Sequence, residues 1–341
     1  MNAQRIPRVA APVAMILAFL LVLAGCSSSS GGDRKGAGNT DVATGGERFG
    51  TADADTAKLG TDAAPGVFPR TIKHANGETT LEKKPTRIVV LDTGELDDVL
   101  TLGVTPVGMV TTKGANPVPS YLAGRVRDVP SVGEINALDL EAIAELEPDL
   151  ILGSKLRADN LYPTLAKIAP TVFSIRPGFP WKENFRLVGT ALGMEKQTVD
   201  TLNTYADHAK ALKTEVTGNP TISLLRFMSG RTRLYGNKSL IGVILQDAGL
   251  ARPTDQNVAE LAVEISRENL AKADGDYLFY TSYGTPAATA EQAVLGSPGW
   301  QQLGAVRNHK AFRVDDDVWF LGLGPTGANL IVDQLGGFLA H

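Results

Sequence analysis

Residues 195–217, with the sequence EKQTVDTLNTYADHAKALKTEVT, decide the fold predicted for this chain. Apolar side chains recur at spacings of three and four, and charged side chains occupy the opposite face, which indicates one amphipathic helix. At 1.5 Å per residue such a helix is about 34 Å long. Gly193 precedes it, and Gly218-Asn219-Pro220 ends it. A helix of this length is able to connect two lobes. Its apolar positions are Val199, Leu202, Tyr205, Ala206, Ala209, Leu212 and Val216.

Short apolar runs alternate with helical segments on both sides of this helix. After a hairpin expected at 68–84, strands are expected at 87–91, 105–110, 149–152, 171–175, 222–227, 232–235, 277–281 and 311–314. Helices are expected at 95–102, 140–146, 161–168, 240–248, 267–273 and 327–339. Such alternation predicts βαβ units with parallel sheets. The fold class is therefore α/β, with two Rossmann-like parallel-sheet lobes, 67–194 and 218–341, joined by one long α-helix at 195–217.

A faint internal repeat supports two related lobes. Residues 141–152 align without gaps on residues 268–279, with three of twelve positions identical. Each copy has a helix, a breaker, an aspartate and an apolar strand. Glu141 and Glu268 occupy equivalent positions early in these helices.

The N-terminus has the pattern of a secretory signal. Arg5 and Arg8 precede an uncharged apolar run at 13–24, which is too short to span a bilayer. Leu23-Ala24-Gly25-Cys26 resembles the bacterial lipobox, whose cysteine is lipidated after cleavage; the alternative is an ordinary signal peptide with an incidental cysteine. We expect a lipoprotein signal peptide at 1–25. Residues 26–66 then form a flexible linker, because their Gly, Ser, Thr and Ala content cannot order the segment by apolar burial.

Composition and motifs exclude several function classes. Among 341 residues there is one cysteine, so no internal disulfide forms, and the net charge of −4 makes nucleic acid an unexpected partner. The four histidines show no metal-ligand spacing, and no nucleophile motif is present. Residues 322–327 match GxGxxG, but no βαβ unit follows, so we predict a tight turn into the last helix. We therefore expect no enzyme, no catalytic residue and no protein-held metal.

The order of these features resembles a known family. The segments that carry the likeness are 84–91, 102–108, 140–151, and Trp319 with Gly322, Gly324 and Gly327. Together with the lipobox and linker, they resemble the substrate-binding lipoproteins of iron–siderophore, haem and cobalamin ABC importers. The resemblance implies two lobes with ligand in the cleft, small closure about the single helix, and no intrinsic cofactor. It also implies a monomer anchored by lipid at the outer face of the cell membrane.

Charged and aromatic side chains follow the expected strands at the edge where open α/β sheets bind ligands. Guanidinium groups suit the oxygens of an anionic chelate, and aromatic rings suit a large planar ligand. The alternatives are a surface position or salt bridge for each arginine, and core packing for each aromatic. Arg233 stays open, because it points to the other face of its strand from Thr232 and Leu234. The ligand-binding candidates are Arg226, Arg157, Arg231, Trp181, Tyr235, Tyr283, Trp319 and Thr93.

The resemblance also implies a permease partner. Glu141 and Glu268 match the lobe glutamates that related proteins present to arginine pockets of an ABC permease dimer. The alternative is that both acids only stabilise the first turns of their helices.

The predicted function is capture of a ferric siderophore for an ABC importer in iron uptake. Haem is an alternative ligand, with Tyr235 or Tyr283 as the axial residue, and cobalamin is another. A cell-surface α/β enzyme or a non-transport scaffold represents a different class.

Overall fold

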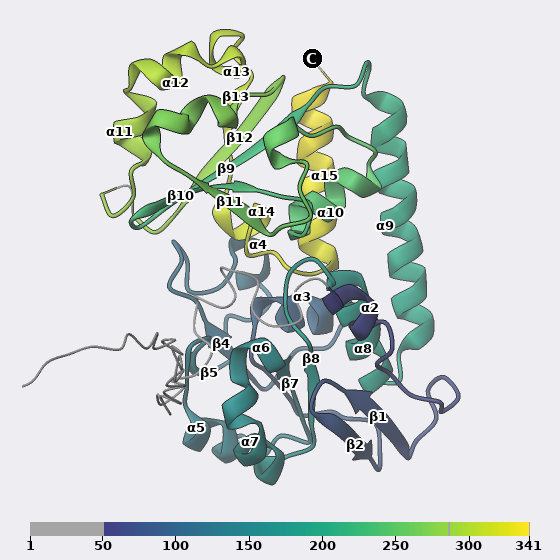
Figure 1. Cartoon of the computed structure of the whole chain (residues 1–341). Coiled ribbons are helices and arrows are strands. Elements are labelled where there is room, and N and C mark those ends of the chain that lie inside the picture. The colour runs from purple at the N-terminus through teal and green to yellow at the C-terminus, as the bar shows by residue number, and fades with distance from the viewer. Residues whose placement is uncertain (1–50, 286, 341) are drawn as a thin grey trace, which may run out of the picture. The chain divides into compact units, whose positions relative to one another are not determined.

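The computed structural model describes residues 51–285 and 287–340 (Figure 1). The predicted signal peptide, the lipobox residue Cys26 and most of the predicted linker lie outside these residues. The described chain contains a six-stranded sheet, a five-stranded sheet and a two-stranded hairpin. Each larger sheet contains parallel strands and belongs to one lobe, which confirms the predicted α/β class with two lobes.

The first lobe is built on a sheet with the strand order β6-β5-β4-β3-β7-β8. Its strands run parallel except for the short β5–β6 pair. Val89 and Val90 belong to different buried clusters, so both faces of the sheet are covered. Burial on both faces explains why these strands are continuous apolar runs rather than alternating ones. The strands are β3 (Ile88–Val90), β4 (Gly108–Thr111), β5 (Ser131–Glu134), β6 (Ala137–Leu138), β7 (Leu150–Ser154) and β8 (Thr171–Ser174).

Helical segments and a hairpin accompany the described strands of the first lobe. The predicted hairpin is confirmed as β1 (Arg70–His74) paired antiparallel with β2 (Gly77–Leu81). The helical segments are α3 (Thr93–Thr101), α4 (Ser120–Ala123), α5 (Leu140–Glu145), α6 (Lys155–Ala158), η2 (Asp159–Leu161), α7 (Tyr162–Ile168) and α8 (Trp181–Ala191).

The sheet of the second lobe has the order β11-β10-β9-β12-β13 and is mixed, not parallel throughout. Strands β9, β12 and β13 are parallel, whereas β10 is antiparallel to both β9 and β11. Only Ser229 and Gly230 separate β9 from β10, and a parallel crossover needs about a dozen residues or more. The strands are β9 (Ile222–Met228), β10 (Arg231–Tyr235), β11 (Ala262–Ile265), β12 (Tyr277–Tyr283) and β13 (Ala311–Arg313).

Helical segments of several lengths accompany the second sheet. The longest is α15, which packs against α9, α3 and α10. The segments are α10 (Leu240–Asp247), η3 (Thr254–Gln256), η4 (Arg267–Ala273), α11 (Glu291–Leu295), α12 (Pro298–Gln302), α13 (Gly304–Arg307), α14 (Asp316–Trp319) and α15 (Pro325–Leu339).

The helix predicted at 195–217 is α9 (Glu195–Glu215). Its buried side chains include Leu202, Tyr205 and Leu212, which lie on the predicted apolar face. The helix packs against α8 of the first lobe and against α10 and α15 of the second, and Figure 1 shows it running alongside both lobes. The predicted apolar residue Val199 is 48% exposed and lies at the edge of this face.

The faint repeat has a structural counterpart in two aspartates. Asp149 accepts hydrogen bonds from the backbone N–H groups of Thr86 and Arg87, just before β3. Asp276 accepts from the backbone N–H and the hydroxyl of Thr221, just before β9. In each lobe the aspartate before one parallel strand therefore fixes the start of its neighbour.

The GxGxxG segment forms part of a contact between the lobes. The backbone N–H groups of Thr326 and Gly327, at the start of α15, donate to the Asp97 carboxylate at 3.0 and 2.9 Å. The anion at this helix N-terminus is therefore a side chain of α3. A Cβ at Gly324 would lie 2.6 Å from the Cβ of Asp97, so a glycine permits the approach. The predicted turn into the last helix is confirmed.

The folded body begins before the predicted boundary at residue 66. Ala52, in α2 (Ala52–Thr56), is fully buried in a cluster with Ile175 and Phe179. Gly60 forms a β-bridge with Lys73. The linker interpretation was therefore wrong for residues 51–66, because their order comes from contacts with distant parts of the chain.

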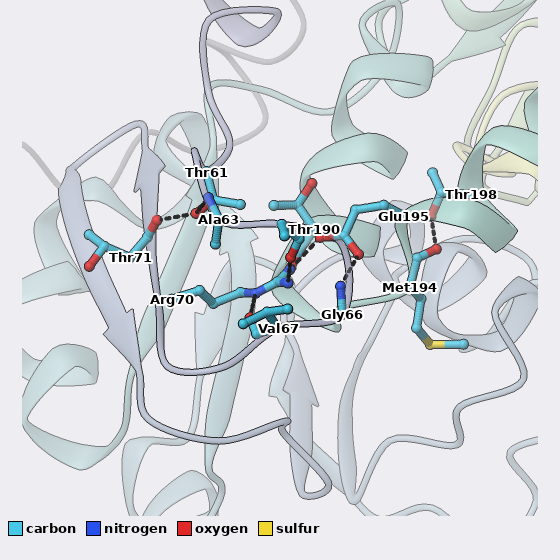
Figure 2. Close-up of polar contacts among 11 residues, drawn as sticks. Thr61, Ala63, Gly66, Val67, Arg70, Thr71, Thr190, Met194, Glu195 and Thr198 are labelled. Carbon is cyan, nitrogen blue, oxygen red and sulfur yellow. Dashed lines mark hydrogen bonds and ion pairs between the residues drawn. The ribbon is translucent and has the colours of Figure 1, made fainter.

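Arg70 holds the end of this segment against the start of α9 (Figure 2). Its guanidinium has no exposed area and forms an ion pair with Glu195. It also donates to the carbonyl oxygens of Ala64, Val67 and Thr190 at 2.9, 2.8 and 2.7 Å. These hydrogen bonds give partners to backbone carbonyl groups that regular secondary structure leaves unpaired. The arginine side chain thus orders a segment that has few apolar residues.

Candidate functional site

A cavity of about 370 Å³ is lined by residues from both lobes. The first lobe contributes residues that follow β4, β5, β7 and β8, and the second contributes β9, β10 and the ends of β12 and α14. Most of these positions lie at or beyond the carboxyl ends of parallel strands, where open α/β sheets bind ligands. Among the described residues, six basic side chains line the cavity, whereas Glu134 is the single acid in the lining. The basic residues are Lys113, Arg157, Arg176, Arg226, Arg231 and Arg233.

Six of the eight predicted ligand residues belong to this lining. They are Arg157, Arg226, Arg231, Tyr235, Tyr283 and Trp319. Trp319 has no exposed area, however, and packs on Phe279 with ring centres 4.7 Å apart. It supports the wall from behind, while its neighbour Phe320 retains 7% exposure.

Trp181 and Thr93 do not line the cavity, and both predictions were wrong. Trp181 is fully buried, with its ring edge-to-face on Tyr205 at 4.8 Å. The first turn of α8 points this side chain toward α9, not toward the ligand space. Thr93 is 2% exposed, and its hydroxyl donates to the carbonyl oxygen of Leu321 at 2.9 Å.

Arg226 is surrounded by partners on every side. Its guanidinium forms a two-pronged ion pair with Asp316, and its Nη1 donates to the Tyr235 hydroxyl at 3.1 Å. The rings of Tyr283 and Phe320 lie 4.8 and 5.0 Å from the guanidinium carbon. This arrangement holds a buried charge rigidly at the cavity wall.

The antiparallel register of β9 and β10 places Arg233 directly opposite Arg226. Opposite residues of such a pair share one face, so two like charges lie side by side. Arg226 is neutralised by Asp316, and Arg233 donates to Glu264 at 3.2 and 2.8 Å. Arg231 shares this glutamate at 3.4 Å. The structure thus places Arg233, which the sequence left open, in the cavity lining.

Two neighbouring guanidiniums lie on the wall of the first lobe. Arg157 donates from Nε to Asp92 at 2.8 Å. Arg176 is 3% exposed, and its Nε donates to the carbonyl oxygen of Pro177 at 3.2 Å. Burial, and then the positive charge of Arg157, lower the pKa of Arg176 to about 10. Arg176 therefore remains charged at neutral pH.

Lys113, Arg176 and Phe320 are lining residues that our sequence reasoning missed. Lys113 follows β4, and Arg176 follows β8, so the rule that selected Arg157 applies to both. For Phe320 the sequence favoured the adjacent tryptophan, and only packing shows which ring faces the ligand space.

A buried carboxyl group lies behind this wall. Glu95 is 4% exposed on α3. Burial, and then the charge of Asp92, raise the pKa of Glu95 from 4.5 to about 8. At neutral pH this side chain is therefore mostly uncharged.

We predict that Glu95 makes the protein less stable as the pH rises from 4.5 to 8. In this window the folded protein holds the Glu95 proton, whereas the unfolded chain releases it. The contribution is complete below pH 4.5 and is lost as the pH rises to 8, at about 1.4 kcal/mol per pH unit. Glu95→Gln should remove this slope and exceed the wild type in stability above pH 8. Denaturant unfolding across pH 5–9 measures the effect, and equal slopes for both proteins would contradict it.

The two predicted docking glutamates are exposed. Glu141 lies in the first turn of α5, whose N-cap residue Asp139 accepts from the Glu141 and Ala142 N–H groups. Glu268 lies in the first turn of η4, where a hydrogen bond from Ser266 and a backbone hydrogen bond lower its pKa. Both carboxyl groups are therefore available to a partner.

Two findings concern metals and membranes. In the chain from 51 to 340, residue 286 aside, no three His, Cys, Asp or Glu side chains are grouped to hold a metal ion. Over the same residues, no helix combines the length and hydropathy of a membrane span.

Comparison with known protein families gives the decisive match for this architecture. A model described as periplasmic binding protein matches residues 88–318, which span both lobes and α9. The chain belongs to this family. The Bacillus subtilis protein named "Probable siderophore-binding lipoprotein YfiY" is 34% identical over 282 residues, covering 78% of this chain and 86% of that protein. "Fe(3+)-citrate-binding protein YfmC" of the same organism is 32% identical over 258 residues, covering 73% and 79%.

The periplasmic binding protein fold is also present in a solved structure. Staphylococcus aureus SirA, crystallised with staphyloferrin B, aligns with a TM-score of 0.72 and 32% identity. The alignment covers 79% of this chain and 98% of SirA. The family is one of binding proteins, and the names of these relatives give siderophores and ferric citrate as ligands but lend no support to haem.

Proposed function

We propose that this periplasmic binding protein captures an anionic ferric siderophore outside the cytoplasmic membrane and delivers it to an ABC importer. The observation that carries the proposal is the cavity whose lining contains six basic side chains and one acid. Guanidinium groups bind carboxylate oxygens through paired, charge-assisted hydrogen bonds. The names of two relatives, which give ferric citrate and staphyloferrin B as ligands, support an anionic chelate that bears carboxylates.

The carboxylates that pair with the cavity arginines also support an anionic ligand, because they hold the guanidinium groups in place. Asp92, Asp316 and Glu264 each hold at least one guanidinium in place. The arginines are thus fixed before a ligand arrives, which lowers the ordering cost of binding. Tyr235 accepts from Arg226 and contacts the Phe320 ring, so its position favours support of the wall over axial ligation of haem.

We predict that ferric citrate or ferric staphyloferrin B stabilises the protein, whereas haem and an uncharged ferric tris-hydroxamate do so less. A ligand present at about 100 times its Kd adds about 2.7 kcal/mol to the unfolding free energy. Thermal unfolding with each chelate, and with the matching iron-free chelator as control, measures the effect. Stabilisation by the uncharged chelate alone would contradict the anionic preference.

We also propose that Glu141 and Glu268 dock the protein on its permease. Each lobe presents one exposed glutamate at an equivalent place before β7 or β12. A receptor with two lobes that docks over a symmetric pore needs one such docking residue on each lobe. Rim charges of this kind set orientation and association rate.

The proposed location is the outer face of the cell membrane, with lipid on Cys26. The relative YfiY is named a lipoprotein.

We predict that Cys26→Ala abolishes incorporation of radiolabelled palmitate and leaves the precursor uncleaved by lipoprotein signal peptidase. Immunoblotting and acyl labelling of cells measure both effects, with Ser27→Ala as the control. Acyl label that persists in Cys26→Ala would contradict the anchor.

A further inference from the structure

Arg157 differs from Arg226 in how many of its hydrogen-bond donors are used. Its Nε donates to Asp92, and within the described residues neither terminal nitrogen has a hydrogen-bond partner. Both terminal nitrogens nevertheless retain contact with solvent, and the side chain lines the cavity. Arg226, in contrast, uses Nε and both terminal nitrogens on Asp316 and Tyr235. Arg157 therefore offers a free two-pronged donor to a ligand.

Asp92 is placed to fix the direction of this donor. It is 1% exposed and lies between the end of β3 and the first residue of α3. One carboxylate oxygen, Oδ1, accepts from the Thr93 N–H at 2.7 Å and caps the helix. The other, Oδ2, accepts from Arg157 Nε. The helix cap and the central strand thus hold the carboxylate that orients the guanidinium.

We propose that Asp92 is a positioning residue for ligand binding, which aims the terminal nitrogens of Arg157 at an anionic group of the chelate. This inference rests on the proposed function of the cavity. Asp92 does not line the cavity itself, so its effect on the ligand passes through Arg157.

An electrostatic role and a positioning role of Asp92 predict opposite effects of the change Asp92→Asn on ligand affinity. If Asp92 acted only through its negative charge, neutralising it would strengthen binding of an anion. If it positions Arg157, the change weakens binding, because the asparagine oxygen remains on the Thr93 N–H and its NH₂ group then faces Arg157 Nε. Two donors in contact repel, and the guanidinium is displaced. The asparagine still caps α3, which keeps the structural role of the residue.

The experiment measures Kd for ferric citrate and ferric staphyloferrin B by quenching of tryptophan fluorescence. The proteins are the wild type, Asp92→Asn, Arg157→Ala and the double variant. We expect Asp92→Asn to weaken binding by about 10-fold, and Arg157→Ala by about 10- to 100-fold. The double variant should bind as Arg157→Ala does, because Asp92 then has no arginine to orient. Asp98→Asn, in the helix that Asp92 caps and equally buried, controls for the change of a buried acid to its amide and should bind as the wild type does.

Each outcome bears on one claim. Unchanged or tighter binding by Asp92→Asn, or additive losses in the double variant, would overturn the positioning role. If Asp92→Asn does not fold, Arg157→Lys replaces it; this change keeps the charge but removes the fork, and wild-type affinity would equally overturn the inference. A wild type that binds neither chelate would instead contradict the proposed ligand class.

Discussion

Arg226→Ala should lower the free energy of unfolding by about 3–5 kcal/mol, because it leaves the buried Asp316 carboxylate without its partner. Arg226 and Asp316 are each 6% exposed, so the ion pair is largely shielded from water. The change also removes the hydrogen bond to Tyr235 and the contacts with the Tyr283 and Phe320 rings. Urea unfolding followed by circular dichroism measures the loss.

Arg231→Ala is the matched control on the neighbouring strand. Its side chain is 36% exposed, and its partner Glu264 is 54% exposed and also pairs with Arg233. An exposed pair of this kind contributes about 0–1 kcal/mol. Similar losses for the two variants would contradict the dominant role of burial.

The sequence alone predicts a binding loss for Arg226→Ala of about 1.5–3 kcal/mol, from a charge-assisted bond to the ligand. That loss is to be measured under conditions where the variant is fully folded.

The double change Glu141→Ala/Glu268→Ala should reduce uptake of the iron chelate by at least about 10-fold while its Kd stays unchanged. Both side chains are exposed, and neither lines the cavity. Each single change should give intermediate uptake, because one lobe keeps its docking glutamate. Transport of ⁵⁵Fe-labelled chelate at native expression, together with Kd of the purified protein, measures both quantities.

Glu145→Ala supplies the control for this experiment, since it removes an exposed acid from the same helix as Glu141. It should leave uptake unchanged. Normal uptake by the double variant would refute docking through these residues. A loss of chelate binding would place them in the fold or the cavity instead.

The sequence by itself determined the features that depend on local periodicity. The helix α9, the apolar strands such as β3 and β7, and the hairpin β1–β2 follow from spacing and turn residues. The rule that ligands bind at strand ends also located Arg157, Arg226 and Tyr283 correctly at the cavity. These patterns need no knowledge of distant contacts.

Only the tertiary structure decided what depends on partners far apart in the chain. Residues 51–66 are ordered by contacts such as the hydrogen bonds of Ala64 with Arg70 and of Gly66 with Glu195, which composition does not reveal. Trp181 lies in the core although it was expected at the ligand, and Phe320, which the sequence did not select, lines the cavity, because packing sets which ring faces the cavity. The pairing of Arg226 with Asp316 spans 90 residues. A sequence pattern carries no signal for such a bond, because it forms only when β9 and α14 are brought together in the folded second lobe.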